Sequence, residues 1–327
     1  MSRQLIAFIT FITLAACSRG TDKNLIEVNA DSRKGFNFPY LLYVPETISD
    51  NKEVLLIVEP NNSGFANDKL REHLKKARRT ASIDFYTGNY VSGKLGYPLL
   101  VPVFPRPESD WKIYTHALDR DAVLQKGNPL ERLDAQLIRM IEHARDTLQR
   151  LGYPTEERVL MTGFSASGTF VNRFSLIHPN RVFALAAGGL NGLLMLPVRE
   201  MNGHRLNYPL GTNDFSDLFG MTFDSAAFRS IPQFLYMGKL DDNDAVLFDD
   251  GYDPDERETV FRTTGEKMQP DRWNSCRDLY LAENINATII SYDSLGHENP
   301  LRVKEDILSF FTSVIDSSHS SGLTNAR

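Results

Sequence analysis

A serine at the apex of a tight turn is the first side chain in this sequence that could carry chemistry. Ser165 lies within the run TGFSASG, residues 162–168, between a short apolar segment and a segment with apolar residues at helical spacing. This pattern predicts a strand, a sharp turn and a helix, which together expose a serine hydroxyl at the turn. Strand and helix can approach only if the residues two positions before and after the apex are small, and Gly163 and Ser167 meet that condition. If Ser167 were the apex instead, β-branched Thr169 would crowd the turn. An ordinary turn rich in small residues remains the alternative.

A hydroxyl becomes a useful nucleophile only when a base takes its proton, and that base needs a carboxylate to orient it. The strand expected at 234–237 is followed by the run GKLDDND, which places Asp241 just past its end, with Asp242 and Asp244 as rivals. His297 follows the strand expected at 287–292 and precedes a terminal helix. Ligands of open α/β sheets bind at the carboxyl ends of strands, so these residues and Ser165 are candidates for one site.

Six other histidines compete with His297. For four of them, which lie in helical, charged or terminal segments, we expect surface or structural roles: His73, His143, His178 and His319. His116 follows the fourth strand and could border the cleft, although a structural role is favoured. His204 lies in a long insertion and could line a lid.

With a serine, an aspartate and a histidine in this order, each after a predicted strand, the chain resembles the α/β-hydrolase superfamily. The run TGFSASG is most similar to that of secreted esterases of the polyhydroxybutyrate-depolymerase and feruloyl-esterase type, although the usual motif has glycine where this chain has Ser167. The resemblance implies that Ser165 is the nucleophile, His297 the general base and then acid, and Asp241 the group that orients it. It further implies that the chain cleaves a carboxylic ester through an acyl-enzyme and needs no cofactor. Two alternatives remain open: a non-catalytic lipoprotein of this fold that binds a ligand or an envelope partner, and a peptidase or acyltransferase with the same three residues.

The oxyanion of such a reaction needs two hydrogen-bond donors, and the resemblance implies where they lie. The N–H of Ala166 would be the first. The second would come from Asn61 or Asn62 after the third strand, because Pro60 has no N–H. The chain has EPNN here, where many relatives have His-Gly. The acidic loop 241–255 could be solvated or could bind calcium, but its carboxylates lack the EF-hand spacing, so no metal site is predicted.

Short apolar runs separated by turns predict strands at 25–28, 40–44, 54–58, 98–104, 182–187, 234–237 and 287–292, in addition to the one that ends at Ser165. Apolar residues at helical spacing predict helices over 130–151 and 303–314. Together they predict an α/β fold, with a mostly parallel central sheet and helices on both faces.

Two intervals, 190–232 and 243–272, are longer than this scheme needs, so we expect them to form walls or a lid over the site. Aromatic residues of the first interval, among them Phe219 and Phe223, could line an acyl pocket or form a small core of their own. We favour the core.

The amino terminus carries a targeting signal. Residues 1–16 combine Arg3, a short apolar run and small residues, which predicts a secretory signal peptide. The run LAAC at 14–17 resembles the lipobox of bacterial lipoproteins and implies that Cys17 bears lipid. Residues 17–24 would then be a tether, 25–316 a single hydrolase domain and 317–327 a flexible tail.

The expected location is the bacterial cell envelope, in the periplasm or at the cell surface. Ser18 after the cysteine would favour the outer membrane of a Gram-negative cell. The net charge of −6 and the lack of a basic stripe argue against a nucleic-acid partner. With only two cysteines, one of them lipidated, no disulfide framework is possible. The expected partners are an ester, small or polymeric, and the membrane reached through the lipid.

Overall fold

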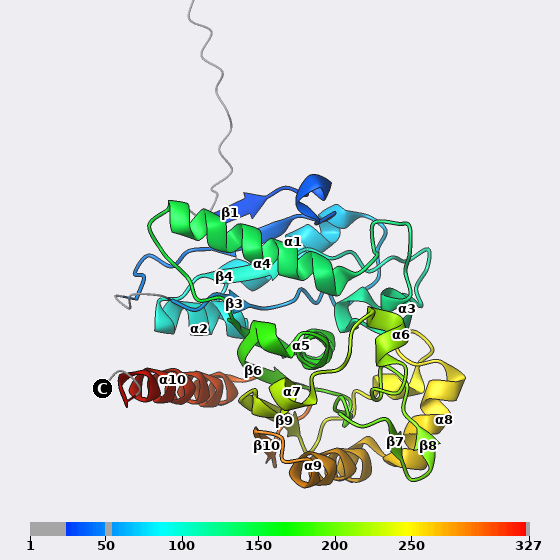
Figure 1. Cartoon of the computed structure of the whole chain (residues 1–327). Coiled ribbons are helices and arrows are strands. Elements are labelled where there is room, and N and C mark those ends of the chain that lie inside the picture. The colour runs from blue at the N-terminus through cyan, green and yellow to red at the C-terminus, as the bar shows by residue number, and fades with distance from the viewer. Residues whose placement is uncertain (1–23, 50–53, 325–327) are drawn as a thin grey trace, which may run out of the picture.

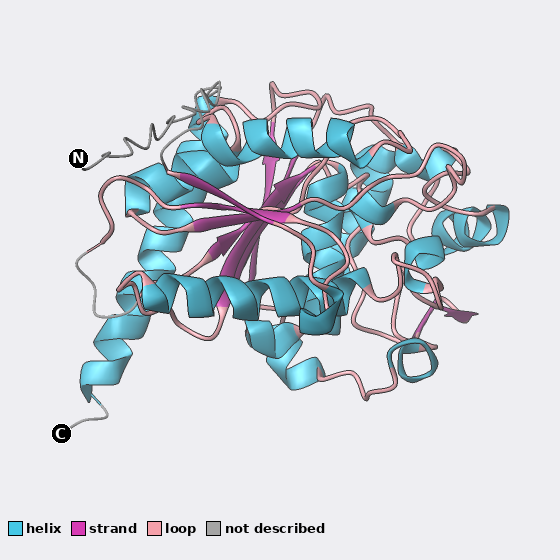
Figure 2. Cartoon of the chain, turned by 90° about the horizontal axis from the view of Figure 1, so that it is seen from above, coloured by secondary structure: helices cyan, strands magenta, loops and turns pink. Residues whose placement is uncertain are grey.

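The computed structural model describes residues 24–49 and 54–324, and within them eight strands form one twisted sheet (Figures 1 and 2). The strands are β1 (Leu25–Val28), β2 (Tyr40–Tyr43), β3 (Ile57–Val58), β4 (Leu99–Pro102), β5 (Val159–Phe164), β6 (Val182–Gly188), β9 (Gln233–Gly238) and β10 (Ala287–Tyr292). Their order across the sheet is β1-β2-β4-β3-β5-β6-β9-β10. Within this sheet, as far as the structure describes the chain, only the pairings of β1 with β2 and of β2 with β4 are antiparallel. The predicted mostly parallel sheet is confirmed.

Two strands are shorter than predicted. The run 54–58 pairs regularly only at Ile57 and Val58, with one isolated bridge from Val54 to Thr155. The run 98–104 pairs only from Leu99 to Pro102. The N–H of Val103 still donates to the carbonyl oxygen of Pro39 at 3.0 Å, but Pro39 has no N–H to return the bond, so regular pairing ends at Pro102.

Helices cover both faces of the sheet, as Figure 2 shows. The longer ones are α1 (Leu70–Ser82), α2 (Thr87–Leu95), α4 (Leu133–Arg150), α5 (Ala166–Ile177), α9 (Trp273–Ala282) and α10 (Leu301–Thr324). Successive strand residues point to opposite faces. Leu99 and Val101 therefore join the core under α1, α2 and α10, whereas Leu100 joins the core under α4, α5 and α9.

The terminal helix α10 is longer than predicted. It continues to Thr324, so the expected tail from 317 is helical over most of its length. The tail was inferred from polar composition, but polarity alone does not end a helix, and no proline follows Pro300.

The two long intervals carry structure of their own. The interval 190–232 contains the hairpin β7 (Glu200–Met201) and β8 (His204–Arg205), then α6 (Phe215–Phe219) and α7 (Ser225–Ser230). The interval 243–272 contains a 3-10 turn, η4 (Ala245–Leu247), and the helix α8 (Pro254–Thr263). Figure 1 shows β7, β8, α6 and α8 together at one end of the molecule.

Within the described residues, no helix is both long and apolar enough to cross a membrane. The predicted signal peptide and Cys17 lie outside those residues, as do residues 18–23 of the tether.

Candidate active site

Ser165 forms the turn between β5 and α5. Its backbone has φ 61° and ψ −131°, a conformation that a residue with a side chain adopts only under strain. Its N–H donates to the carbonyl oxygen of Gly188 at 2.9 Å, which fixes the turn to β6. A Cβ atom at Gly163 would lie 2.4 Å from the carbonyl oxygen of Ser167, so the strand and helix approach as closely as the sequence pattern requires.

Ser167 stands where the usual motif has glycine, and the structure explains why a serine fits there. Its Oγ donates to the carbonyl oxygen of Phe164 at 2.9 Å and accepts the N–H of the same residue at 3.0 Å. The side chain is small enough for the turn, and its two hydrogen bonds stabilise the turn. Since Ser167 is buried, Ser165 is the more accessible of the two hydroxyls.

Asp241 and His297 lie side by side after β9 and β10. The Nδ1 atom of His297 is 3.0 Å from Oδ2 and 3.1 Å from Oδ1 of Asp241. The carboxylate of Asp241 is 1% exposed, whereas the imidazole is 24% exposed, so the acid is buried behind the base. With the Nδ1 proton held by Asp241, Nε2 is left as a proton acceptor.

The two rival acids lie elsewhere. Asp242 is exposed. Asp244 forms an ion pair with buried Arg272 and caps η4. Of the three acids, Asp241 is the one in contact with His297.

Ser165 and His297 do not share a hydrogen bond within the described residues. The Nε2 atom of His297 instead lies 3.2 Å from the side-chain nitrogen of Asn243. Asn243 also lines the small cavity that Ser165 opens into, and the imidazole packs on the ring of Phe164 with centroids 4.7 Å apart. The side chain of Asn243 therefore lies between the cavity beside Ser165 and the Nε2 atom of His297. Catalytic hydrogen bonds often tighten only when substrate is bound.

The expected oxyanion donors lie at the start of α5 and after β3. Ala166 is the first residue of α5, where an N–H has no partner within the helix. The side chain of Asn61 is buried, with Oδ1 accepting the N–H of Phe104 at 3.0 Å and Nδ2 donating to its carbonyl oxygen at 2.9 Å. No described residue supplies an acceptor for the backbone N–H of Asn61 or Asn62, so both remain candidates.

Two buried histidines support this loop. The Nε2 atom of His116 lies 2.9 Å from the carbonyl oxygen of Phe104 and 3.1 Å from Nδ2 of Asn61. Burial lowers the pKa of His116 to about 3, so its imidazole is neutral. His73, in α1, contacts Ser63 Oγ through its Nδ1 atom at 2.7 Å. The structural roles expected for both histidines agree with these contacts, but the sequence did not show that they hold the loop after β3.

A small cavity of about 30 Å³ opens beside Ser165. Arg173, Asn243 and Tyr252 are among its lining residues. The guanidinium of Arg173 is buried and donates to Tyr252 Oη and to the carbonyl oxygen of Ala117, each at 3.0 Å. Tyr252 and Asn243 come from the interval 243–272, so this interval forms part of the wall around the serine.

A larger cavity of about 460 Å³ lies on another side of His297. It is bounded by α1, α2, the end of β3 and the segment that leads from His297 into α10. Its lining residues include Glu59, Asn62, Lys76, Phe85, Tyr86, Thr87, Phe164, His297 and Asn299.

Aromatic residues of the interval 190–232 line neither of these two cavities. Phe215 and Phe219 pack with their ring centroids 4.9 Å apart, and Phe223 and Phe228 pack with theirs 6.0 Å apart. They belong to the core under α4 and α5. Of the two roles considered for this interval, the structure therefore has the core and not the acyl pocket.

The acidic loop is held by cations from the protein itself. Asp250 pairs with Arg106 and Asp249 with Arg257, at 2.5 and 2.6 Å. Across the described ranges, no group of three or more His, Cys, Asp or Glu side chains is placed to hold a metal ion.

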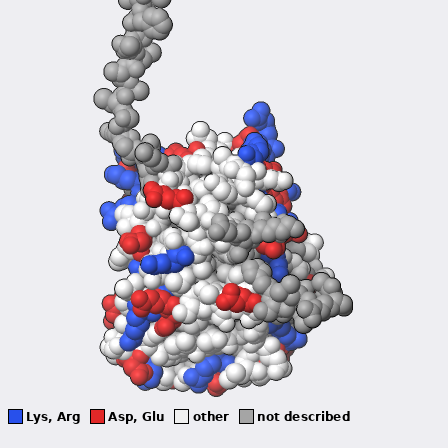
Figure 3. Space-filling model, turned by 90° about the vertical axis from the view of Figure 1, so that its left-hand side faces the viewer, with Lys and Arg blue, Asp and Glu red and all other residues white. Residues whose placement is uncertain are grey.

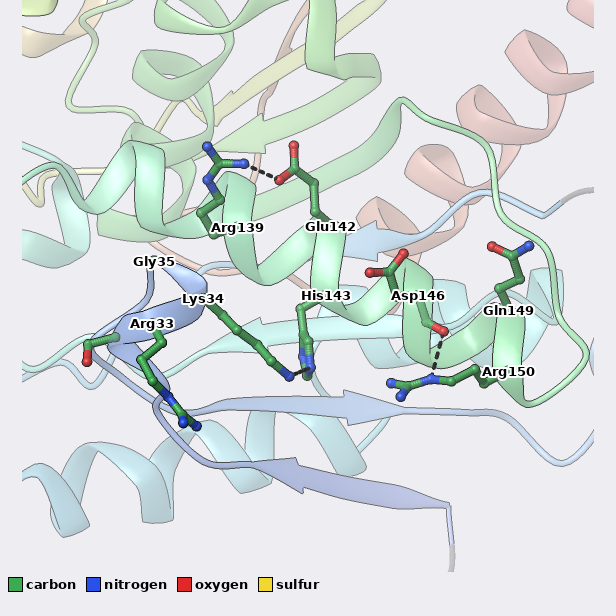
Figure 4. Close-up of a pocket in the computed structure, with 10 residues that line it drawn as sticks. Arg33, Lys34, Gly35, Arg139, Glu142, His143, Asp146, Gln149 and Arg150 are labelled. Carbon is green, nitrogen blue, oxygen red and sulfur yellow. Dashed lines mark hydrogen bonds and ion pairs between the residues drawn. The ribbon is translucent and has the colours of Figure 1, made fainter.

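A depression of about 980 Å³ lies away from Ser165, between α4 and the 3-10 turn η1 (Ser32–Lys34) (Figure 4). Its charged side chains are satisfied within the protein: Arg139 pairs with Glu142 at 2.7 Å, and Lys34 Nζ lies 2.7 Å from His143 Nε2. The face in Figure 3 likewise shows acidic and basic side chains interspersed. Neither the depression nor this face is therefore lined by charges of a single sign.

No family model matches the chain, and no curated protein matches it. Solved structures do. Poly(aspartic acid) hydrolase-1 from Sphingomonas sp. KT-1 is 16% identical over 84% of this chain and 94% of its own, with a TM-score of 0.54. A poly(3-hydroxybutyrate) depolymerase from Bordetella parapertussis is 14% identical over 88% of each chain, with a TM-score of 0.52. At such low identity, the likeness shows a shared fold.

Proposed function

We propose, from the α/β-hydrolase fold of this chain, that it is a serine hydrolase that cleaves carboxylic esters through an acyl-enzyme. One observation carries the proposal: a buried carboxylate, Asp241, holds the Nδ1 side of His297, next to the strained turn that presents Ser165. A carboxylate-bound histidine beside a serine turn is the arrangement that activates a hydroxyl.

The steps follow from this geometry. Nε2 of His297 takes the proton of Ser165 as Oγ attacks the ester carbonyl carbon. The oxyanion that forms accepts hydrogen bonds from Ala166 N–H and from Asn61 or Asn62 N–H. The C–O bond to the alcohol then breaks, and His297 gives its proton to the leaving oxygen. Water, deprotonated by His297, attacks the acyl-enzyme and releases the acid and the free serine.

The size of the cavity beside Ser165 supports a preference for short acyl groups. Its volume of about 30 Å³ is enough for about two water-sized groups. An acetyl group fits that space without movement of the wall, whereas a long acyl chain needs Asn243 and Tyr252 to move.

A hydrolase of amides is the second candidate. The fold is shared with a poly(aspartic acid) hydrolase, and the same three residues can attack an amide carbonyl. An amide is the harder substrate because its leaving nitrogen must receive the proton of His297 before the C–N bond breaks.

The proposed location is the bacterial envelope, with Cys17 carrying lipid and the hydrolase domain in the periplasm or at the cell surface. The run LAAC before Ser18 supports this part of the proposal. An ester reachable from the envelope is the proposed substrate.

The test is hydrolysis of p-nitrophenyl acetate, butyrate and octanoate by a chain that begins at Ser18, beside Ser165→Ala. We expect the rate to fall with acyl length and to be lost in the variant for every ester. Absence of hydrolysis by a folded wild-type chain would favour the non-catalytic alternative. Turnover of an aspartyl p-nitroanilide in place of the esters would favour the amide candidate.

A further inference from the structure

The cavity of about 460 Å³ beside His297 has a buried acid in its wall. Glu59 follows β3 and is 6% exposed. Its Oε2 atom accepts the N–H of Gly88, the second residue of α2, at 2.6 Å. A Cβ atom at Gly88 would lie 2.5 Å from that oxygen, so glycine lets α2 approach the carboxyl group this closely. No described residue bonds the other oxygen, Oε1, so the carboxyl group has one free oxygen on a cavity that it lines.

Neither of the two lysines near Glu59 forms an ion pair with its carboxyl group. Lys304 of α10 donates to the carbonyl oxygens of Asp84 and Phe85, at 2.8 and 3.3 Å. Lys76 of α1 lines the same cavity. Neither lies within 4.0 Å of the carboxyl group of Glu59. Burial raises the pKa of the Tyr236 phenol in β9, and a negative charge on Glu59 would raise it further. The remaining ionisable groups on the cavity wall are Tyr86, His297 and Glu298.

Burial without an ion pair changes the charge of Glu59. It raises the pKa of this carboxyl group to about 8, since its hydrogen bond from Gly88 and the charge of Lys304 only partly compensate. At neutral pH most of the population is therefore a neutral acid, which can donate a hydrogen bond as well as accept one.

The other groups around the cavity suit a neutral ligand with hydroxyls. The rings of Phe85, Tyr86 and Phe164 offer flat apolar walls. Asn299 donates from Nδ2 to Thr87 Oγ1 at 2.6 Å, which leaves its Oδ1 atom without a partner among the described residues. That oxygen is buried, so the free carboxyl oxygen of Glu59 is the unmet hydrogen-bonding group that a ligand in the cavity would satisfy.

The position of His297 indicates which part of the substrate lies here. In the proposed reaction His297 hands its proton to the leaving alcohol oxygen, so that oxygen must lie against the imidazole. The cavity beside Ser165 has room only for a short acyl group, whereas the larger cavity begins at His297. The alcohol part of the ester therefore projects into the larger cavity.

We propose that this cavity binds the alcohol part of the ester as an uncharged group that carries hydroxyls, and that Glu59 is a specificity-determining residue that hydrogen-bonds one of them. The proposal rests on the proposed esterase function.

A matched pair of acetates tests it. Glycerol 1-monoacetate and n-propyl acetate have the same acyl group and the same number of alcohol carbons, and they differ in two hydroxyls. We measure kcat/KM for each on wild type, Glu59→Gln and Glu59→Leu, and take the ratio of the two substrates. Wild type should prefer the monoacetate at least about tenfold, the value of one good hydrogen bond. Glu59→Gln should keep the preference, because an amide also donates and accepts, and Glu59→Leu should lose it.

The pH dependence of the same ratio separates recognition from packing. Any effect of pH on the step that both substrates share cancels in the ratio. The wild-type preference should therefore decline as pH rises through about 8, where Glu59 loses its donor, whereas Glu59→Gln should show no decline. This comparison stands even if Glu59→Leu fails to fold, because Gln keeps the shape of Glu.

Outcomes against the inference are distinct from outcomes against the esterase function. A ratio near one in wild type, or a preference that Glu59→Leu keeps, would overturn the role of Glu59. Hydrolysis of both acetates would still support the esterase function. If the preference of Glu59→Gln declined with pH as that of wild type does, the role of Glu59 would also be overturned. Absence of hydrolysis of either acetate by folded wild type would overturn the proposed function first.

Discussion

At the scale of single residues, activity in the proposed mechanism depends on which group hydrogen-bonds to the Nε2 atom of His297. Asp241 holds Nδ1, and the amide of Asn243 lies 3.2 Å from Nε2. In the proposed mechanism Nε2 carries the lone pair that receives the proton of Ser165, so the amide and the hydroxyl compete for it. The backbone N–H of Asn243 also donates to Asp241 Oδ1 at 3.0 Å, so the residue stabilises the acid while its side chain blocks the base.

Asn243→Ala should separate these two effects. The substitution keeps the backbone hydrogen bond to Asp241 and removes the amide. We expect fluorophosphonate labelling of Ser165 to become faster by about fivefold, the equivalent of one hydrogen bond of about 1 kcal/mol. Asp242→Ala, at the exposed neighbouring position, is the control and should not change the rate. Slower labelling of Asn243→Ala would mean that the amide orients His297 instead of competing with the serine.

Asp241→Asn should reduce kcat for p-nitrophenyl acetate by about 10³–10⁴, because an amide no longer holds the imidazole with its proton on Nδ1. The protein should fold as before, since the amide has the same shape. Asp242→Asn is the matched control and should retain full activity. A loss of less than tenfold at Asp241 would remove it from the proposed mechanism.

At the scale of elements, the helix that begins at the turn of Ser165 is anchored at its other end. His178 follows α5 directly, and its Nε2 lies 2.8 Å from Asp134 in α4. Arg132 pairs with the same carboxylate at 2.8 Å. The carboxylate is 1% exposed, so it joins α4 to the end of α5 within the protein interior.

Asp134→Asn should lower the free energy of unfolding by about 3 kcal/mol, the usual cost of breaking a buried ion pair by removing one partner. Chemical denaturation at pH 7 measures it. Asp146→Asn, on the exposed face of the same helix, should stay within about 0.5 kcal/mol of wild type. Equal stabilities of the two variants would show that the contact with His178 and Arg132 contributes little.

The same pair predicts a pH dependence. Burial opposes ionisation of Asp134, but the hydrogen bonds from His178 and Arg132 outweigh it and lower its pKa to about 2. The unfolded value is about 3.9, so the stabilising contribution is complete above that pH and is lost as pH falls toward 2. The stability difference between wild type and Asp134→Asn should therefore narrow between pH 4 and pH 2. A constant difference over that range would contradict the pKa.

At the scale of the whole molecule, periodic patterns in the sequence predicted the sheet and the order of the three candidate residues along it. Ser165, Asp241 and His297 could be found because each lies in the turn or loop after a strand. Local patterns also misled, as polarity did for the end of α10. The contacts that shape the site were not predictable, because they join residues far apart in the chain: Glu59 with Gly88, Asn61 with His116, and Arg173 with Tyr252.

The membrane anchor is a prediction for the whole chain that the described residues do not test. We expect the full chain, made in a bacterium that processes lipoproteins, to incorporate an alkynyl fatty acid and to partition into the detergent phase. Cys17→Ala should abolish both, because the remaining cysteine, Cys276, is buried. Fatty-acid incorporation that persists in Cys17→Ala would contradict the lipobox.

The most direct test of the central claim is covalent labelling of the chain that begins at Ser18 with a fluorophosphonate, followed by intact mass. Only an activated serine reacts readily with such a probe, so the measurement reports the nucleophile without any choice of substrate. We predict one added probe mass on wild type and on Ser167→Ala, and none on Ser165→Ala. A well-folded wild type that takes no label, or a Ser165→Ala variant that still takes it, would contradict the claim that Ser165 is the nucleophile of a hydrolase.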